Sequence, residues 1–107
     1  MKVKLYRINA ERDVNRVRFV CFGRMVRYQH SDRIDSGIYD LIFDGEAECK
    51  TLNETYAWFN RPVPDSCHMF ISDIIEVWES GEPRFYFFNM DGFRCVDFEP
   101  ERAFACF

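Results

Sequence analysis

Residues 85–88 read Phe-Tyr-Phe-Phe, and this run constrains the fold of the chain more than any other segment. Successive side chains of a strand point to opposite faces, so this strand is apolar on both faces and needs cover on both. Turn-forming residues bound the run, with Ser-Gly-Glu-Pro at 80–83 and Asn-Met-Asp-Gly at 89–92. We therefore predict an antiparallel meander of three strands, at residues 74–79, 84–88 and 93–98.

Alternation of polar and apolar residues predicts three earlier strands, at residues 2–9, 16–21 and 38–44. Between the last two, Phe22, Met25 and Val26 recur at helical spacing, which favours a short helix over residues 22–30.

A second helix is predicted from Thr51 to Asn60, because Thr51 and Glu54 have the spacing of a capping box. Leu52, Tyr56 and Phe59 form its apolar stripe. The chain as a whole therefore predicts an α+β fold. We expect an antiparallel sheet of about five strands that ends in the meander, with one or two helices packed on one face.

Pro100 is expected to end the sheet. Residues 101–107 then form a short tail, and its Phe104 and Phe107 should pack back onto the domain or onto a partner.

The length of 107 residues fits one domain spanning residues 1–107, and 12 Phe, 5 Tyr and 2 Trp supply its core. The N-terminus lacks the unbroken apolar stretch of a signal peptide, and no segment is apolar enough for a membrane span. We expect a cytoplasmic protein. The five scattered cysteines, expected to be free thiols, are Cys21, Cys49, Cys67, Cys95 and Cys106.

No residue pattern predicts an active site. Cys67 and His68, near Asp65 and Asp73, come closest to a nucleophile and its base, but adjacent residues of extended chain point apart. Neither a zinc-ligand spacing nor a Gly-rich phosphate loop occurs. We predict a protein that is not an enzyme and takes no cofactor, metal or small-molecule substrate.

Charge is divided along the chain. Residues 1–33 carry nine Lys or Arg against three Asp or Glu, whereas residues 34–107 carry five against fifteen. Such asymmetry indicates charged partners, unless the two halves neutralise each other within the fold.

Carboxylates occupy the even positions of the strand at 38–44 and of its extension. If they share one face, they form a row with a spacing of about 6.6–6.8 Å, which could imitate a nucleic-acid backbone and occupy a basic protein groove. An ordinary solvated face is the alternative. The predicted partner-binding residues are Asp40, Asp44, Glu46 and Glu48, extended by Glu76, Glu79 and Glu82 if their strands are neighbours.

Direct nucleic-acid binding is a further alternative, because phosphate contacts need clustered cations. The residues that would supply them are Arg16, Arg18, Arg24 and Arg27, with Tyr28 for stacking. A sequence pI of about 5.1 is unusual for this role.

A series of short stretches resembles the YodL-like domain, a small module of mobile genetic elements and of their large polyvalent proteins. The stretches are residues 6–9, 39–46, 52–60 with Pro62, 67–75, 85–87, 91–93 and Phe98. Where the family has a Gly-His-Ser-type segment, this chain has Cys67, His68 and Met69. Ser72 and Asp73 are expected to make a turn hydrogen bond that starts the next strand.

The resemblance implies no established activity. It implies a mobile-element context, in which small accessory proteins often blunt host defences such as restriction or CRISPR nucleases. The leading hypothesis is therefore a protein-binding inhibitor of a host defence complex, such as an RNA-guided CRISPR nuclease, whose basic channel the acidic row would occupy. The alternatives are a structural or regulatory module that binds another protein of the same element, and a nucleic-acid-binding module that uses the basic N-terminal third.

Overall fold

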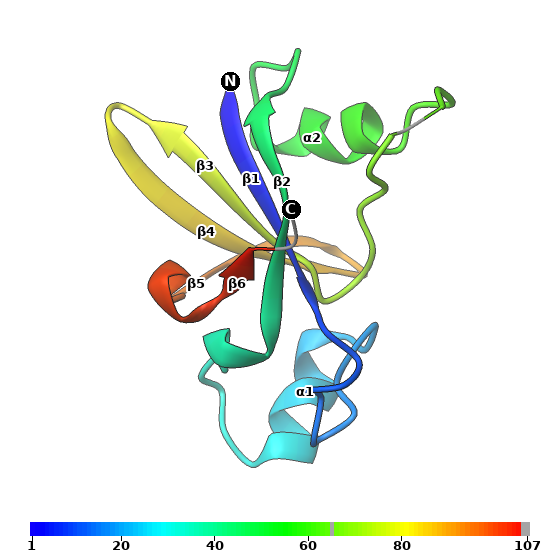
Figure 1. Cartoon of the computed structure of the whole chain (residues 1–107), viewed down its shortest axis with the longest axis vertical. Helices are drawn as coiled ribbons and strands as arrows, with labels where there is room; N and C mark the ends of the chain where they lie inside the picture. The colour runs from blue at the N-terminus through cyan, green and yellow to red at the C-terminus, as the bar shows by residue number, and fades with distance from the viewer. Residues whose placement is uncertain (65, 106–107) are drawn as a thin grey trace.

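The two-sided aromatic strand lies inside a six-stranded sheet in a computed structural model, which describes residues 1–64 and 66–105 (Figure 1). The strand order is β5-β4-β3-β1-β2-β6, and every pairing is antiparallel except that of β2 with β6. The strands are β1 (Lys2–Ile8), β2 (Tyr39–Glu46), β3 (Ile74–Glu79), β4 (Glu82–Asn89), β5 (Gly92–Val96) and β6 (Phe104–Ala105).

Two α-helices accompany the sheet, α1 (Phe22–Gln29) and α2 (Leu52–Phe59), and short 3-10 turns cover Ser36–Ile38 and Pro100–Arg102. The α+β prediction and the meander of β3, β4 and β5 are confirmed. The predicted capping box of α2 is not formed: the Thr51 side chain makes no cap hydrogen bond, and Glu54 accepts a hydrogen bond from the backbone N–H of Lys50 at 3.2 Å. Neither helix of the described chain has the length and apolar character needed to cross a membrane.

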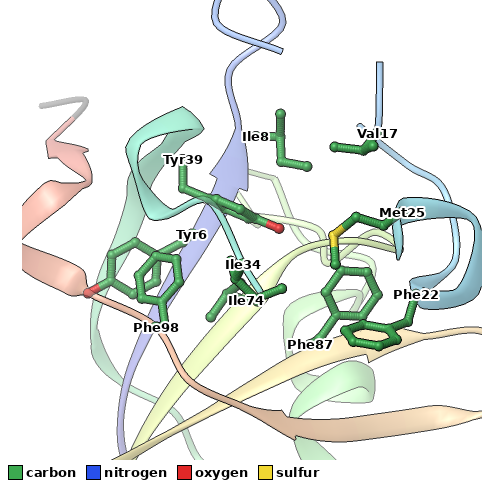
Figure 2. Packing of buried hydrophobic residues seen from close by; sticks show 10 residues of the cluster. All are labelled: Tyr6, Ile8, Val17, Phe22, Met25, Ile34, Tyr39, Ile74, Phe87 and Phe98. Atoms are coloured by element: carbon green, nitrogen blue, oxygen red, sulfur yellow. The ribbon is translucent and has the colours of Figure 1, made fainter. Parts of the chain in front are cut away.

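The sheet separates two apolar cores, because alternate residues of its strands face opposite sides. On β1, Tyr6 and Ile8 belong to the core beneath α1, shown in Figure 2, whereas Val3 and Leu5 belong to the core beneath α2. The two helices therefore cover opposite faces, where one shared face was expected. Both apolar faces of β4 are therefore covered: Phe87 packs under α1, while Tyr86 and Phe88 pack toward α2.

A β-bulge at Ile42 reverses the alternation of β2. Leu5 of β1 pairs with Phe43, and the next residue, Tyr6, pairs with Leu41, so Ile42 has no partner on β1. As a result, Leu41 packs in the core beneath α1 and Phe43 in the core beneath α2. Two residues an even number of positions apart normally share a face of a strand, but across this bulge they face opposite sides of the sheet.

The segment 16–21 is not the strand that its alternation predicts. The carboxylate of Asp13 accepts the backbone N–H groups of Val17 and Arg18 at 2.9 Å each, and Arg16 and Phe19 adopt positive φ. These local bonds fold the segment into tight turns, because they offer the backbone an alternative to a sheet ladder.

The C-terminal tail adds a strand beyond Pro100, where none was predicted. β6 pairs in parallel with β2, Asp40 against Phe104, and the Arg12 guanidinium lies 4.3 Å above the Phe104 ring. The tail thus returns to the domain. Its expected contact through Phe107 lies outside the described residues.

We predict opposite stability effects for one chemical change at two glycines. Gly81 turns the β3–β4 hairpin with a φ of +83°, so Gly81→Ala should lower the free energy of unfolding by about 1 kcal/mol. Gly23 lies in α1, and a Cβ added there would meet no other atom. Gly23→Ala should therefore raise the free energy of unfolding by about 0.5–1 kcal/mol. Urea unfolding of both variants measures the two shifts, and equal signs would contradict the backbone assignments.

Candidate protein-interaction site

The predicted acidic row is divided between the two faces of the sheet. Asp40 pairs with Arg7 of β1, whereas Asp44 pairs with Lys4, and these two partners lie three residues apart on a regular strand. Their side chains point to opposite faces, and so do those of Asp40 and Asp44. Glu46 shares the face of Asp44, but Glu48 lies beyond the end of β2.

Two of the predicted partner-binding residues are buried and serve the fold. Asp40 accepts a hydrogen bond from Asn9 at 2.8 Å and forms an ion pair with Arg12 at 2.5 Å. Glu76 accepts hydrogen bonds from the Tyr6 hydroxyl at 2.8 Å and from the Trp78 indole at 2.6 Å. Both carboxylates lie inside the domain and are not offered to a partner.

The remaining acidic residues are exposed but do not form one continuous surface. Asp44 and Glu46 lie on β2, and Glu79 and Glu82 flank the β3–β4 hairpin. β1 runs between β2 and β3 and contributes two lysines to the same face as Asp44. Lys4 lies 4.0 Å from Asp44, and Lys2 stands over the Trp78 ring at 5.0 Å. Cations therefore interrupt the predicted acidic surface.

The four arginines of the nucleic-acid alternative lie on the loop after β1 and on α1. Arg16, Arg24 and Arg27 are exposed, and Arg18 is half-buried with its guanidinium 4.4 Å above the Phe19 ring. Arg24 lines a hollow that Phe19 also lines. Arg18 instead lines a separate hollow with Arg7, Glu11 and Asp40, so these two arginines border different hollows.

Cys67 and His68 do not form a nucleophile–base pair within the described residues. The His68 ring contacts the Ser66 hydroxyl at 3.4 Å, and the backbone oxygen of His68 accepts a hydrogen bond from the Arg7 side chain. Burial raises the pKa of the Cys67 thiol, which opposes thiolate formation. Asp65 lies outside the described residues. The described chain also holds no group of three or more His, Cys, Asp or Glu arranged to bind a metal.

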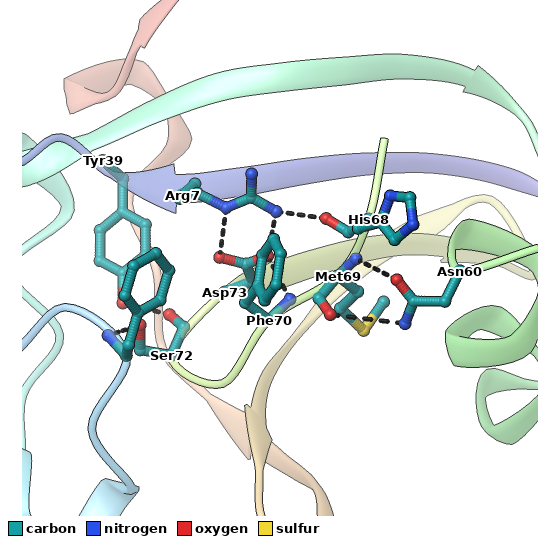
Figure 3. A network of polar contacts seen from close by, with 9 residues as sticks. Arg7, Tyr39, Asn60, His68, Met69, Phe70, Ser72 and Asp73 are labelled. Atoms are coloured by element: carbon teal, nitrogen blue, oxygen red, sulfur yellow. Dashed lines mark hydrogen bonds and ion pairs between the residues drawn. The ribbon is translucent and has the colours of Figure 1, made fainter. Parts of the chain in front are cut away.

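Ser72 and Asp73 form a buried polar node that ties four segments together (Figure 3). The Ser72 hydroxyl accepts a hydrogen bond from the Phe19 N–H at 2.8 Å, and the Ser72 backbone carbonyl accepts one from the Tyr39 hydroxyl at 2.8 Å. The Ser72 N–H donates a hydrogen bond to the backbone carbonyl of Phe88 at 3.0 Å, and the Phe88 N–H donates one to the backbone carbonyl of Asp73 at 2.9 Å. The geometry matches the expected turn role of this pair and extends it to distant segments.

The Asp73 carboxylate is held by the Arg7 side chain in a two-pronged ion pair. Arg7 Nε lies 3.1 Å and Nη2 2.8 Å from its two oxygens, and the Phe70 N–H also donates to it at 2.9 Å. Full burial nevertheless raises the pKa of Asp73 to about 6, although Arg7 and the Phe70 N–H lower it. Desolvation therefore outweighs the ion pair at this residue.

An apolar hollow of about 560 Å³ opens beside this node; we call it the aromatic groove. Apolar side chains supply most of its wall, and Phe19, Tyr56, Phe70 and Met90 remain open to solvent. A second hollow of about 390 Å³ continues from it and shares Phe19, Ile71 and Met90. The lining residues of the aromatic groove are Phe19, Tyr56, Met69, Phe70, Ile71, Phe88, Asn89 and Met90.

The walls of the aromatic groove are fixed by hydrogen bonds from their own backbone. The Phe19 and Phe70 N–H groups are bound by the Ser72–Asp73 node. The Met69 N–H donates to the Asn60 side chain at 2.9 Å. The Phe22 N–H donates to the Asn89 side chain at 3.0 Å. The groove is therefore a preformed feature of the fold.

Sequence reasoning missed this site because its residues come from loops and turns far apart in the chain. A signal was present, however. Met90 is an apolar residue inside a predicted turn, and residues 69–71 form a Met-Phe-Ile run in the connection between the predicted helix at 51–60 and the predicted strand at 74–79. Apolar residues at positions that should face water are the mark of an interaction surface.

The fold and this loop-built groove describe a small α+β domain with an apolar hollow that is open to solvent. Its sequence matches the model of the YodL-like domain over residues 2–98, and the chain therefore belongs to the YodL-like domain family. Comparison with curated proteins found no match. Comparison with solved structures also found none.

We predict that Asp73 gives the protein a measurable pH dependence of stability. Its folded-state pKa of about 6 exceeds its ordinary value of 3.8, so the folded state holds the proton more tightly than the unfolded state. The stability from this group is complete below pH 4 and is lost as the pH rises to about 6, by about 3 kcal/mol in total.

Asp73→Asn should remove this dependence. Chemical denaturation from pH 4 to pH 7 should therefore show wild type losing stability relative to Asp73→Asn as the pH rises. A constant difference between the two proteins across that range would show that Asp73 titrates normally.

Proposed function

We propose that this chain is a non-catalytic protein-binding module that docks a partner in the aromatic groove. The observation that carries the proposal is the exposure of its rim: Phe19, Tyr56 and Phe70 are 46–47% exposed and Met90 is 77% exposed. Aromatic and methionine side chains gathered at one solvent-open hollow are typical of interface anchors, because they bury large apolar areas on binding.

The state of the surrounding polar groups supports binding over catalysis. Asp73 and Ser72 are committed to the hydrogen bonds that hold the walls, and Arg7 is committed to Asp73. A rigid groove also loses little conformational freedom when a partner binds, which favours affinity.

Met90→Glu should abolish capture of the partner, because it places a carboxylate in the apolar hollow where it would be desolvated on binding. The matched control is Val14→Glu, since Val14 is an apolar residue that is 82% exposed away from the groove. Both variants should fold as stably as wild type. Affinity capture from lysate, with and without nuclease treatment, compares the three proteins, and equal capture by Met90→Glu would refute the proposed docking site.

The finer proposal concerns the partner, which we propose to be an effector of a host defence complex such as an RNA-guided CRISPR nuclease. The resemblance to modules of mobile genetic elements and the acidic excess of residues 34–107 support it. In this proposal, exposed carboxylates compete for a basic nucleic-acid channel. The residues available for that competition are Asp44, Glu46, Glu48, Glu79 and Glu82.

Charge reversal tests the acidic competition separately from the groove. The triple variant Asp44→Lys, Glu46→Lys and Glu48→Lys should lose inhibition of the nuclease while it stays folded, because surface ion pairs contribute little to stability. Asp40 is left intact because it is buried against Arg12. The control reverses three exposed acids elsewhere, Glu11, Asp32 and Glu101.

Normal inhibition by the triple variant would end the mimicry proposal. Capture of proteins encoded only by the same element would favour the alternative of a structural or regulatory module.

A further inference from the structure

We propose that the outer edge of β5 is an interaction surface at which a second copy of this chain adds its own β5. The two strands pair antiparallel about a two-fold axis, so that the two sheets become one continuous sheet. This inference goes beyond the proposed function, because the aromatic groove and its continuation are lined by other segments of the described chain.

The two outer edges of the described sheet differ in how they are protected. β2 forms one edge, where β6 covers its beginning and the rest carries the bulge at Ile42 and the exposed Asp44 and Glu46. Covering segments, bulges and charged side chains keep an edge strand from pairing with another chain. β5 forms the other edge, and its register with β4 is regular throughout. β5 is therefore the edge that is open to a further strand.

The backbone groups of Phe93 and Cys95 point outward from this open edge. Phe88 directs its N–H and carbonyl toward the segment before β3. Because these groups alternate in direction along a strand, Phe87 directs its own toward β5, where its pairing partner is Arg94. The N–H and carbonyl groups of the residues on either side of Arg94 consequently face away from β4. They offer another strand two donors and two acceptors.

Side-chain charge selects the register of this pairing. Outward-facing residues must oppose each other, which allows the two-fold axis to pass through Arg94, Cys95 or Val96. An axis through Arg94 would set two guanidiniums directly opposite each other, which is destabilising. An axis through Val96 would set Arg94 opposite Phe98, which is buried in the core and lies beyond the end of β5. The axis through Cys95 avoids both problems and sets Arg94 opposite Val96 of the second copy.

This register brings a cation of each copy beside carboxylates of the other. A hollow of about 220 Å³ adjoins Val96, and more carboxylates than guanidiniums line it. Arg94 is exposed and lies over the Phe22 ring at 4.2 Å. Within residues 1–64 and 66–105, Arg94, Asp32 and Asp97 form no ion pair. The charged lining residues of the hollow are Asp32, Arg33, Arg94, Asp97 and Glu99.

The same complementarity favours a second copy over a strand of another protein. A two-fold interface joins one surface to itself, so it needs a surface that carries both members of each contact. The β5 edge carries the cation, the carboxylates and the outward backbone groups together. The pairing is short, so we expect a dissociation constant between about 10 μM and 1 mM.

Sedimentation equilibrium over a range of protein concentrations tests the self-pairing on the intact chain. The mean mass should rise toward that of a dimer as the concentration increases. Cys95→Pro removes an outward N–H and leaves the bonds to β4, so it should weaken the dimer at least about tenfold. Arg94→Glu should weaken it by a similar factor, because it places a carboxylate beside carboxylates. The matched control is Lys50→Glu, which reverses an exposed charge away from β5 and should dimerise like wild type.

Cross-linking with a short bis-maleimide locates the contact. The two Cys95 side chains should lie about 5 Å apart in the paired strands, so wild type should give a covalent dimer on a denaturing gel. Cys95→Ser should lose this product. Moving the exposed thiol elsewhere, with Cys95→Ser and Val14→Cys together, should not restore it, since Val14 is 82% exposed away from β5. Circular dichroism checks that each variant remains folded.

Three results would overturn the self-pairing. A chain that stays monomeric up to about 1 mM would leave the β5 edge to a strand of another protein. A dimer that neither Cys95→Pro nor Arg94→Glu weakens, or one in which Cys95 is not cross-linked, would form through another surface. Each result leaves the proposed function unaffected, because its test depends on Met90 in the aromatic groove.

Discussion

The buried contact between Arg7 and Asp73 is the interaction on which the rest of this structure depends. Asp73 has no exposed side-chain surface, and it is reached by a guanidinium from β1 and by the N–H of Phe70. Removing a carboxylate from water costs free energy. Here this desolvation cost exceeds the stabilisation of the charged form by Arg7, so the pKa of Asp73 rises. The carboxylate nevertheless fixes the segment before β3 against β1. Ser72 beside it fixes the loop at Phe19, and the two sides of the aromatic groove are thereby set at a constant separation.

The bulge at Ile42 has a comparable effect on the charged surface. An unbroken β2 would have placed Asp40 and Asp44 on one face, as their spacing suggests. The extra residue turns Asp40 toward Arg12 and Asn9, where it serves as a buried acceptor, and leaves Asp44 beside Lys4. One backbone irregularity thus converts a candidate recognition row into one structural carboxylate and a few separate surface charges.

Much of the fold could be predicted from local sequence, and the site could not. The hairpin turns, both helices and the meander follow from turn residues and periodicity, which act over a few residues. The bulge escaped prediction because Leu41, Ile42 and Phe43 are all apolar, so either register buries a hydrophobic side chain. The segment 16–21 has the alternation of a strand, but the Asp13 carboxylate captures its amides. The aromatic groove draws on loops more than fifty residues apart, exemplified by Phe19 on Ser72, and only tertiary structure brings them together.

The Ser72–Asp73 node also separates what holds the groove from what touches a ligand. The groove walls are fixed through backbone amides, whose hydrogen bonds do not depend on the identity of the side chains that project from them. Phe19, Phe70 and Met90 can consequently be replaced without loss of the frame. Under the proposed function, a domain built in this way could change its partner by surface substitution alone, and related copies could recognise unrelated targets on one scaffold.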